Sequence, residues 1–326
     1  MSSSSWYNHI DGIEAVNTLG RERKPFLFIL SYDKDAIFAQ PLDSLDDGIF
    51  YKIESWRNYP VTKRYSSYHF SKTPIPFTQY KKAFERVIEE IKAGNTYLLN
   101  LTFETAIESD LSLKEIFHYA QAKFKLNYKN QFICFSPERF IEIDDGLLST
   151  YPMKGTIEAS IPQASAQILS NPKEMAEHIM IVDLMRNDLG IVGNDIKVTD
   201  FRYIDQIKAG DKELLQVSSH ITATLSENWR DKLGDIIDAL TPAGSITGTP
   251  KKKTREIIEE LEGYKRGFYT GIFGIFDGEH LRSAVMIRFI EERDGSLYYK
   301  SGGGITLDSD AKSEYEEMVD KVYLPL

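Results

Sequence analysis

Three strand-like segments follow one another near the end of the chain, at residues 268–276, 282–291 and 297–300. Only short turns separate them, and turns this short join antiparallel strands, because a parallel pair needs a crossover of a dozen or more residues. Elsewhere, strands and helices are mixed without a steady alternation. The sequence therefore predicts an α+β fold with antiparallel sheet.

Hydrophobic residues at helical spacing predict four helices, at residues 78–94, 173–190, 250–263 and 313–323. Further strands are expected at 26–32, at 97–107, and as a pair across the turn at Ser136-Pro137-Glu138. The segment between residue 32 and about residue 75 looks irregular. In the strand at 97–107, one face carries Leu98, Asn100 and Thr102, a mixed set that could line a cleft.

The chain has 326 residues and 42% hydrophobic content, enough for a large core. No linker-like stretch is visible after residue 70, so we expect one domain over 1–326. Residues 1–70 could form a semi-independent N-terminal layer.

Charge and cysteine content exclude several classes of protein. A net charge of -10 argues against a nucleic-acid surface, since the only evident basic cluster is residues 251–253. A single cysteine, Cys134, excludes an intrachain disulfide and a multi-cysteine metal site. No stretch approaches ~18 consecutive apolar residues, and no signal-like start is seen, so we expect no membrane span and a cytoplasmic protein.

Two pairs of carboxylates stand three residues apart on separate predicted helices: Glu174 with Glu177, and Glu314 with Glu317. Each pair projects from one helix face. Such oxygens suit Mg²⁺, which takes one or two protein carboxylates together with oxygens of an anionic substrate. Solvated helix faces explain the same spacing, and spacing alone brings the two helices no closer together.

Lys154 lies in the stretch "YPMKGT", between an apolar pair and a Gly-Thr turn. A surface lysine, an ion-paired lysine and a stem lying over apolar surface are all compatible with this position. A role of Lys154 in catalysis or binding is a fourth possibility.

Several stretches together resemble the chorismate-utilising enzymes, a family that includes anthranilate synthase component I, aminodeoxychorismate synthase component I, and isochorismate and salicylate synthases. The matching segments lie within residues 74–325 in the family's order and include "SPERFI", "YPMKGT", "AEHIMIVDLMRNDLG", "TPAGSITGTPKKKTREIIEELE" and "SGGGITLDSDAKSEYEEMVDKV". The resemblance implies two large, mostly antiparallel sheets packed together with helices outside, and one active-site cleft.

The resemblance also implies the roles of individual residues. Glu177 and Glu317 would hold Mg²⁺, with Glu174 and Glu314 nearby as weaker or water-mediated ligands. The residues implied to bind substrate are Tyr269, Arg288, Gly302, Gly303, Gly304, Ser245, Gly248 and Lys321. Arginine presents a planar fork that matches a carboxylate, and glycines allow close backbone approach.

In this family a lysine at the position of Lys154 is typical of aminodeoxychorismate synthases. The implied role is attack of its neutral amine on C2 of chorismate with loss of the C4 hydroxyl, after which ammonia enters at C4 and expels the lysine. Partial burial would favour the neutral amine, and Mg²⁺ would disfavour the ammonium. Glu138 matches the family's general acid, which would protonate the leaving hydroxyl.

Two positions depart from the family pattern. Leu98 stands where isochorismate-forming members have a lysine that activates water and many nitrogen-transferring members have a glutamine. Leucine cannot activate water, which argues against isochorismate or salicylate formation. Gln216 stands where the family usually has a histidine, although His220 lies close by.

The leading hypothesis is therefore aminodeoxychorismate synthase component I, which would transfer ammonia to chorismate for 4-aminobenzoate and folate synthesis. No glutamine-hydrolysing motif is visible, so a separate glutamine amidotransferase is the expected partner. Anthranilate synthase component I is the nearest alternative, and a non-catalytic chorismate-binding protein is an alternative of another class.

Overall fold

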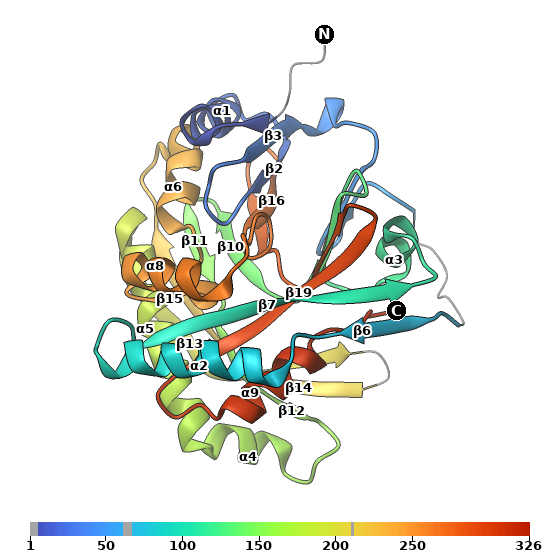
Figure 1. Ribbon diagram of the computed structural model, residues 1–326. Coiled ribbons are helices and arrows are strands. Elements are labelled where there is room, and N and C mark those ends of the chain that lie inside the picture. The colour runs from blue at the N-terminus through green and yellow to red at the C-terminus, as the bar shows by residue number, and fades with distance from the viewer. Residues whose placement is uncertain (1–5, 61–66, 210–211) are drawn as a thin grey trace.

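Two large β-sheets form the framework of the molecule (Figure 1). The computed structural model describes residues 6–60, 67–209 and 212–326. Within them, every pair of neighbouring strands runs antiparallel. The predicted α+β fold of two mostly antiparallel sheets is thereby confirmed.

The ten-stranded sheet draws its strands from the first and middle parts of the chain and from the region near residue 280. Its order is β1 (Trp6–Tyr7), β3 (Ile37–Pro41), β2 (Phe26–Leu30), β16 (Ile272–Phe276), β17 (Leu281–Val285), β10 (Arg139–Asp144), β11 (Leu147–Thr150), β14 (Lys212–Thr224) and β12 (Met153–Glu158), with β13 (Asn194–Ala209) also paired to β14.

The nine-stranded sheet is built around two long strands, β7 and β19, which cross the molecule (Figure 1). Its order is β15 (Gly248–Thr249), β7 (Leu98–Ser109), β19 (Ser296–Ile305), β18 (Phe289–Arg293), β9 (Phe132–Ser136), β8 (Phe124–Tyr128), β4 (Ile49–Ile53) and β5 (Trp56–Arg57), with β6 (Phe70–Thr73) also paired to β7.

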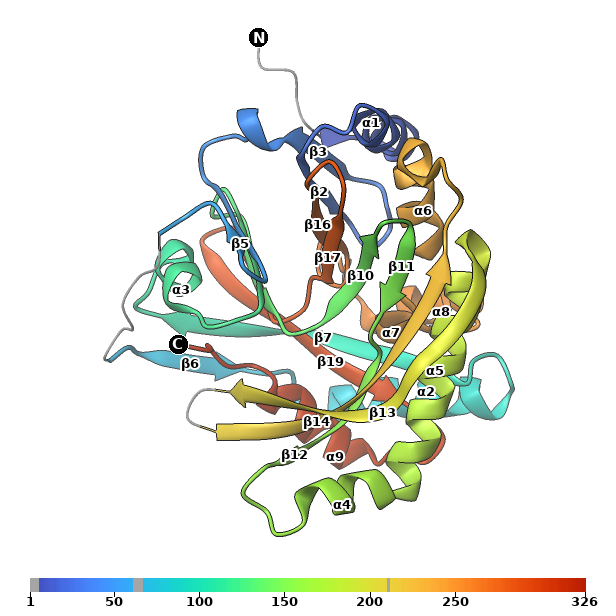
Figure 2. The ribbon, with the colours of Figure 1, turned by 180° about the vertical axis from the view of Figure 1, so that it is seen from behind.

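Helices cover the outer faces of both sheets, as the two opposite views show (Figures 1 and 2). In the described residues they are α1 (His9–Arg21), α2 (Phe77–Lys92), α3 (Leu113–Tyr119), α4 (Ala164–Ser170), α5 (Pro172–Val192), α6 (Leu233–Leu240), α7 (Gly244–Thr247), α8 (Lys251–Glu262) and α9 (Ala311–Asp320), with 3₁₀ turns η1 (Leu42–Ser44) and η2 (Trp229–Lys232).

Apolar clusters explain this layering. Side chains of both sheets, among them Phe38, Phe124 and Phe273, meet in one core between the sheets. Helices α5 and α6 pack on the ten-stranded sheet, while α2, α8 and α9 pack against β7 and β19. Helices thus use their apolar stripes to cover sheet surface, and the two sheets meet through their inner faces.

The helices expected from hydrophobic spacing are all present, with ends that differ by a few residues. The helix predicted at 78–94 begins at Phe77, with Pro76 rather than Thr78 at its N-cap. The helix predicted to stop at Gly190 continues to Val192. Gly263 ends α8 with φ 69°, a left-handed conformation that glycine adopts without strain.

Two strand predictions were wrong. The segment after residue 32 is not irregular, because β3, β4, β5 and β6 lie within residues 37–73. The single strand expected at 282–291 is two strands, β17 and β18, which belong to different sheets. Between them, Arg288 adopts φ 51°, so the chain turns from one sheet into the other at this residue.

Residues 6–57 contribute strands to both sheets. Whether residues 1–70 act as a semi-independent layer stays a prediction, and residues 1–5 and 61–66 of that range lie outside the described residues.

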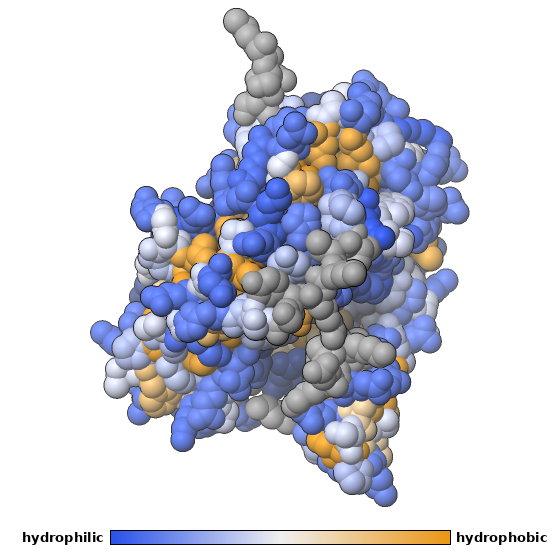
Figure 3. Space-filling model, turned by 90° about the vertical axis from the view of Figure 1, so that its right-hand side faces the viewer, coloured by the Kyte–Doolittle hydropathy of each residue, from blue (hydrophilic) through white to orange (hydrophobic). Residues whose placement is uncertain are grey.

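The face shown in Figure 3 is mainly hydrophilic, with separate apolar patches. No helix in the described ranges combines the length and apolar character needed to cross a membrane.

Candidate active site

A cavity of about 440 Å³ lies where both sheets meet α5 and α9. Ten of the residues singled out from the sequence line it: Glu138, Lys154, Glu174, Glu177, Ser245, Arg288, Gly303, Gly304, Glu317 and Lys321. A smaller space of about 110 Å³ adjoins it and adds Tyr269 and Gly302. Segments far apart in the sequence therefore form one site, although the role of each residue stays a prediction.

Lys154 projects from β12 into this cavity and pairs with Glu177 of α5, with 2.6 Å between Nζ and Oε2. Burial disfavours the charge on Lys154, but Glu177, followed by Glu174 and Glu317, raises its pKa above the usual value. Burial favours the neutral amine, as expected, but the nearby carboxylates outweigh it, so the pKa of Lys154 lies above its usual value.

The two glutamate pairs belong to different helices, Glu174 and Glu177 to α5 and Glu314 and Glu317 to α9. Glu317 lies 2.6 Å from Nζ of Lys321, and Ser309 donates a hydrogen bond to Glu314 at 2.8 Å. A Cβ at Gly303 would lie 3.5 Å from Oε2 of Glu314, 3.7 Å from Nζ of Lys321 and 3.9 Å from Oε1 of Glu317, so β19 passes close to these three side chains of the α9 region. Glu314 itself does not line the cavity.

The glutamates fit a hard cation such as Mg²⁺. Oε2 of Glu174 is buried and has no hydrogen-bond partner within the described part of the chain. Because buried carboxylate oxygens normally have a partner, a bound cation or water molecule would satisfy this atom. In that same part, no three histidine, cysteine or acidic residues lie close enough to hold a metal ion by themselves. Mg²⁺ would therefore depend on one or two of these glutamates plus substrate and water oxygens.

Glu138 also lines the cavity and lies in the short connection between β9 and β10. Oγ of Ser245 donates a hydrogen bond to its Oε1 at 2.6 Å. Burial raises the pKa of Glu138, and this outweighs the lowering by Ser245, Arg288 and Lys321. A carboxyl group with a raised pKa can carry a proton into a cavity, which is what a general acid needs.

Three groups give the inner end of the cavity a positive, hydrogen-bonding character. Nε of the Arg288 guanidinium is buried with no partner among the described atoms. Lys321 donates to the carbonyl of Gly302 at 2.8 Å, and burial lowers its pKa despite Glu317. Tyr269 is buried, which raises the pKa of its phenol. This end of the cavity suits a carboxylate.

Two of the predicted glycines are needed where strands cross closely. A Cβ on Gly302 would lie 2.2 Å from the carbonyl oxygen of Leu101 in β7. Gly248 has φ 122°, and a Cβ there would lie 1.9 Å from the carbonyl oxygen of Leu98. Gly248 therefore brings β15 against β7, and it does not itself line the cavity.

Both departures from the family pattern lie on the cavity wall. Leu98, at 6% exposure, and Gln216 line it, whereas His220 does not. The His220 ring is stacked on Tyr151 with 4.5 Å between ring centroids, and its Nε2 lies 3.1 Å from Oγ of Ser149. The histidine close to Gln216 in sequence is thus engaged away from the cavity.

His178 is a buried residue that sequence reasoning missed. Its Nε2 lies 2.7 Å from Oγ of Ser219, which also accepts the backbone N–H of Arg202 at 3.0 Å. The Ser219 hydroxyl is therefore free to donate to a neutral imidazole. Ser219 N–H in turn donates to the carbonyl of Pro152, two residues before Lys154. His178 thus links α5 to the strand that carries Lys154.

The environment of His178 predicts a loss of stability in acid. Burial, followed by the Arg202 charge, lowers its pKa to about 4, against ~6.5 in an unfolded chain. The unfolded state then binds the extra proton between these values, so this stabilisation is complete above about pH 6.5 and is lost as the pH falls toward 4.

We expect this loss to be on the order of 2 kcal/mol between pH 6.5 and 4.5 in urea unfolding experiments. His178→Asn keeps a polar side chain but cannot titrate, so its stability should fall less over the same interval. Equal pH dependence in the two proteins would contradict the assignment.

With this geometry in place, comparison with known proteins gives a consistent picture. A family model described as chorismate binding enzyme matches residues 56–326. A PabA-like protein of Haemophilus influenzae is 50% identical over 315 residues, which cover 96% of each chain. Aminodeoxychorismate synthase component 1 of Bacillus subtilis is 33% identical over 265 residues, covering 76% of this chain. The aligned part is 55% of that relative, so the chain spans about half of it.

Solved structures agree with the fold. Anthranilate synthase component I from Streptococcus pneumoniae superposes with a TM-score of 0.66 at 25% identity. The superposition covers 79% of this chain and 59% of that protein. The arrangement of two sheets described above is therefore shared with this solved structure.

Proposed function

Because the chain belongs to the family of chorismate-binding enzymes, we propose that it converts chorismate and ammonia to 4-amino-4-deoxychorismate. The observation that carries this proposal is Lys154, which lines the same cavity as Glu138. An amine in the cavity can act as a nucleophile toward the chorismate ring, whereas direct attack by ammonia would need no such residue.

In the proposed reaction, the neutral amine of Lys154 attacks C2 of chorismate, both ring double bonds shift, and the C4 hydroxyl departs. Glu138 supplies the proton with which that hydroxyl leaves as water. Ammonia then attacks C4, both double bonds shift back, and the lysine amine is expelled and regains the proton it gave up on attack. The proton that the incoming nitrogen loses restores the acid form of Glu138. Chorismate and ammonia thus yield 4-amino-4-deoxychorismate and water.

The remaining groups bind and orient the substrate. Arg288 and Tyr269, with the backbone amides of the glycines at 302–304, would hold the enolpyruvyl carboxylate at the inner end of the cavity. Ser245 orients Glu138 through its hydrogen bond. Mg²⁺ at Glu177 and Glu317 would hold the ring carboxylate of chorismate and offset the negative charge that raises the pKa of Lys154.

Ammonia needs a source, and component 1 in the names of the relatives implies a second component. We propose a glutamine amidotransferase partner, in the cytoplasm, for a pathway toward 4-aminobenzoate and folate. Leu98 supports nitrogen transfer over hydration, because an alkyl side chain on the cavity wall cannot activate water.

The test is turnover of chorismate with Mg²⁺ and ammonium. We expect a product that retains the enolpyruvyl group, so no pyruvate is released. Anthranilate synthase, the nearest alternative and the activity named for a similar structure, would release pyruvate. Binding of chorismate without turnover would indicate the non-catalytic alternative.

Ser245 gives a pH test of the acid. Its hydroxyl stabilises the ionised form of Glu138, so Ser245→Ala should raise the pKa of Glu138 further. In the wild-type chain, kcat/KM should fall as the pH rises and Glu138 loses its proton. In Ser245→Ala this fall should occur at a pH about 0.5–1 unit higher. In a Glu138→Gln background the same substitution should cause no such shift. A downward shift would contradict the proposed acid.

A further inference from the structure

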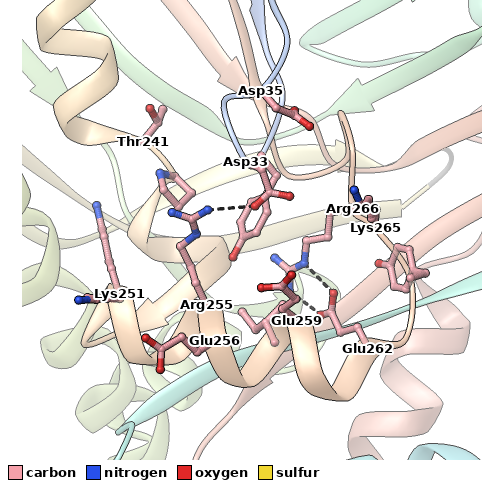
Figure 4. Close-up of a pocket in the computed structure, with 15 residues that line it drawn as sticks. Asp33, Asp35, Thr241, Lys251, Arg255, Glu256, Glu259, Glu262, Lys265 and Arg266 are labelled. Atoms are coloured by element: carbon pink, nitrogen blue, oxygen red, sulfur yellow. Dashed lines mark hydrogen bonds and ion pairs between the residues drawn. The ribbon is translucent and has the colours of Figure 1, made fainter. Parts of the chain in front are cut away.

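A buried ion pair next to the catalytic cavity has no part in the reaction proposed so far. Glu262, the last residue of α8, pairs with Arg266, and their side chains are 1% and 2% exposed. Nε and Nη2 of Arg266 donate hydrogen bonds to the two carboxylate oxygens at 2.8 and 2.6 Å (Figure 4). Both residues line a space of about 670 Å³ beside α8, and neither lines the catalytic cavity or the smaller space that adjoins it.

The remaining N–H groups of Arg266 bind residues of the cavity wall. Nη2 donates to the carbonyl oxygen of Asn100 at 2.6 Å, and Nη1 donates to that of Ile246 at 2.9 Å and to Oγ1 of Thr270 at 3.3 Å. A guanidinium has five N–H donors, so together with the two bonds to Glu262 every donor is used. All three wall residues line the smaller space that adjoins the cavity. One side chain therefore joins segments of β7, α7 and the connection before β16.

The contact with Ile246 leads to the proposed acid. Ile246 follows Ser245 in α7, and Oγ of Ser245 donates the 2.6 Å hydrogen bond to Glu138. Helix α7 has four residues and no side-chain hydrogen bond at its N-cap. A helix this short is not stable by itself, so contacts from outside, such as the one from Arg266, have to hold it in place.

The contacts with Thr270 and Asn100 lead to the groups proposed to bind the enolpyruvyl carboxylate. Thr270 follows Tyr269, and its hydroxyl donates a hydrogen bond to the Tyr269 carbonyl at 2.6 Å. Asn100 belongs to the part of β7 that pairs with the glycines at 302–304 of β19. One guanidinium thus contacts both segments that would hold the carboxylate.

We propose that Arg266 is a positioning residue for the reaction: held by Glu262, it fixes the wall segments that carry the acid and the carboxylate-binding groups. This inference rests on the proposed function, which gives Glu138 and Tyr269 their roles. Stability alone is a weak reason for such a pair, because well-packed apolar side chains of similar volume often stabilise a core at least as well. Apolar side chains, however, cannot bind three wall oxygens in fixed directions.

Lysine in place of Arg266 tests this role. Arg266→Lys keeps the positive charge opposite Glu262, but an ammonium has three donors on one atom and cannot bond to five separate oxygens. Misplacing a reacting group by about 1 Å can slow a reaction by about a hundredfold, so we expect kcat with saturating chorismate and ammonium to fall by about tenfold to a hundredfold. The Kd of chorismate, from calorimetric titration, should rise at least about threefold.

Ser245→Ala separates positioning from a general loss of active protein. Because Arg266 acts on the acid through Ser245, adding Arg266→Lys to Ser245→Ala should lower kcat by less than about twofold, while the Kd of chorismate still rises. A general loss of structure would lower kcat by the same factor with and without Ser245. That result would overturn the proposal, as would an unchanged Kd in Arg266→Lys.

Arg282→Lys is the matched control. Arg282 also donates two hydrogen bonds to one carboxylate, that of Asp144, at 2.7 and 3.0 Å, and neither residue lines the catalytic cavity. The control should keep kcat and Kd within about twofold of the unmodified chain. Equal losses for the two lysine variants would show a general effect of disturbing an arginine–carboxylate contact, and the proposal would be wrong.

Thr270→Val decides the question if Arg266→Lys does not fold. It removes one hydroxyl, leaves the ion pair in place and breaks the link from Arg266 to Tyr269. With an unchanged circular dichroism spectrum, the Kd of chorismate should rise at least about threefold, and kcat should stay within about twofold because Ile246 keeps its contact. An unchanged Kd in this variant would overturn the proposal.

The proposed function can fail separately. If the unmodified chain forms no 4-amino-4-deoxychorismate from chorismate and ammonium, the proposed reaction is wrong. The Kd of chorismate in Arg266→Lys and Thr270→Val still tests the positioning of the carboxylate-binding groups, because binding needs no turnover.

Discussion

Lys154→Ala should lower formation of 4-amino-4-deoxychorismate from chorismate and ammonium by at least about a thousandfold, because it removes the nucleophile of the first displacement. Binding of chorismate should change much less, since Arg288 and the inner end of the cavity remain. Steady-state kinetics with a direct assay of the product, together with calorimetric titration of chorismate, separates the two effects.

Lys154→Arg is the informative companion. Arginine keeps a positive charge opposite Glu177, but it stays protonated and cannot act as an amine nucleophile. The arginine variant should therefore be as inactive as the alanine variant. Activity near that of the unmodified chain would show that position 154 supplies only charge, and it would contradict the covalent route.

Glu262→Ala should reduce the free energy of unfolding by about 3–5 kcal/mol, because it leaves Arg266 as a buried, unpaired charge. Arg266 donates hydrogen bonds to the Glu262 carboxylate through two of its nitrogens, and both side chains are almost completely buried. Thr102 also loses the acceptor for its N–H and its hydroxyl. Urea unfolding followed by circular dichroism measures the change.

Glu256→Ala provides a control on the same helix. Glu256 pairs with Lys253 at 3.0 Å, but both side chains are about half exposed. An exposed pair of this kind contributes little to stability, because solvent screens the attraction, so the control should unfold almost as the unmodified chain does. Similar losses for the two variants would show that burial does not set the contribution of the Glu262–Arg266 pair.

Local pattern was enough to predict the helices but not the partners of the strands. The apolar spacing of α2 and α5 is visible in the sequence because a helix buries one stripe. The segment at 282–291 reads as one strand because both of its halves are apolar. The chain changes direction at Arg288, so β17 and β18 belong to different sheets. No local sequence pattern indicates this turn.

The candidate site could be assembled from motifs only because a family resemblance joined distant segments. Spacing placed Glu177 and Glu317 on helix faces, yet it could not bring α5 and α9 to one cavity. Nor could it give the charge state of Lys154, which depends on how many carboxylates surround the amine once the chain is folded.

Two buried groups were missed for a related reason. His178 resembles any other helix residue in sequence, and its importance comes from Ser219 on a strand 41 positions away. Glu262 and Arg266 look like an ordinary surface pair spaced four apart. Their burial depends on β7 and α7, which pack over them. The i, i+4 spacing was the available signal, but it does not distinguish a buried pair from an exposed one.

The most direct test of the central claim is the position of nitrogen in the product made from chorismate, Mg²⁺ and ¹⁵N-labelled ammonium. The account predicts that NMR will show the label bonded to C4, with the enolpyruvyl group still attached. A label on C2, with pyruvate released, or an oxygen at C2 and no label at all, would contradict it.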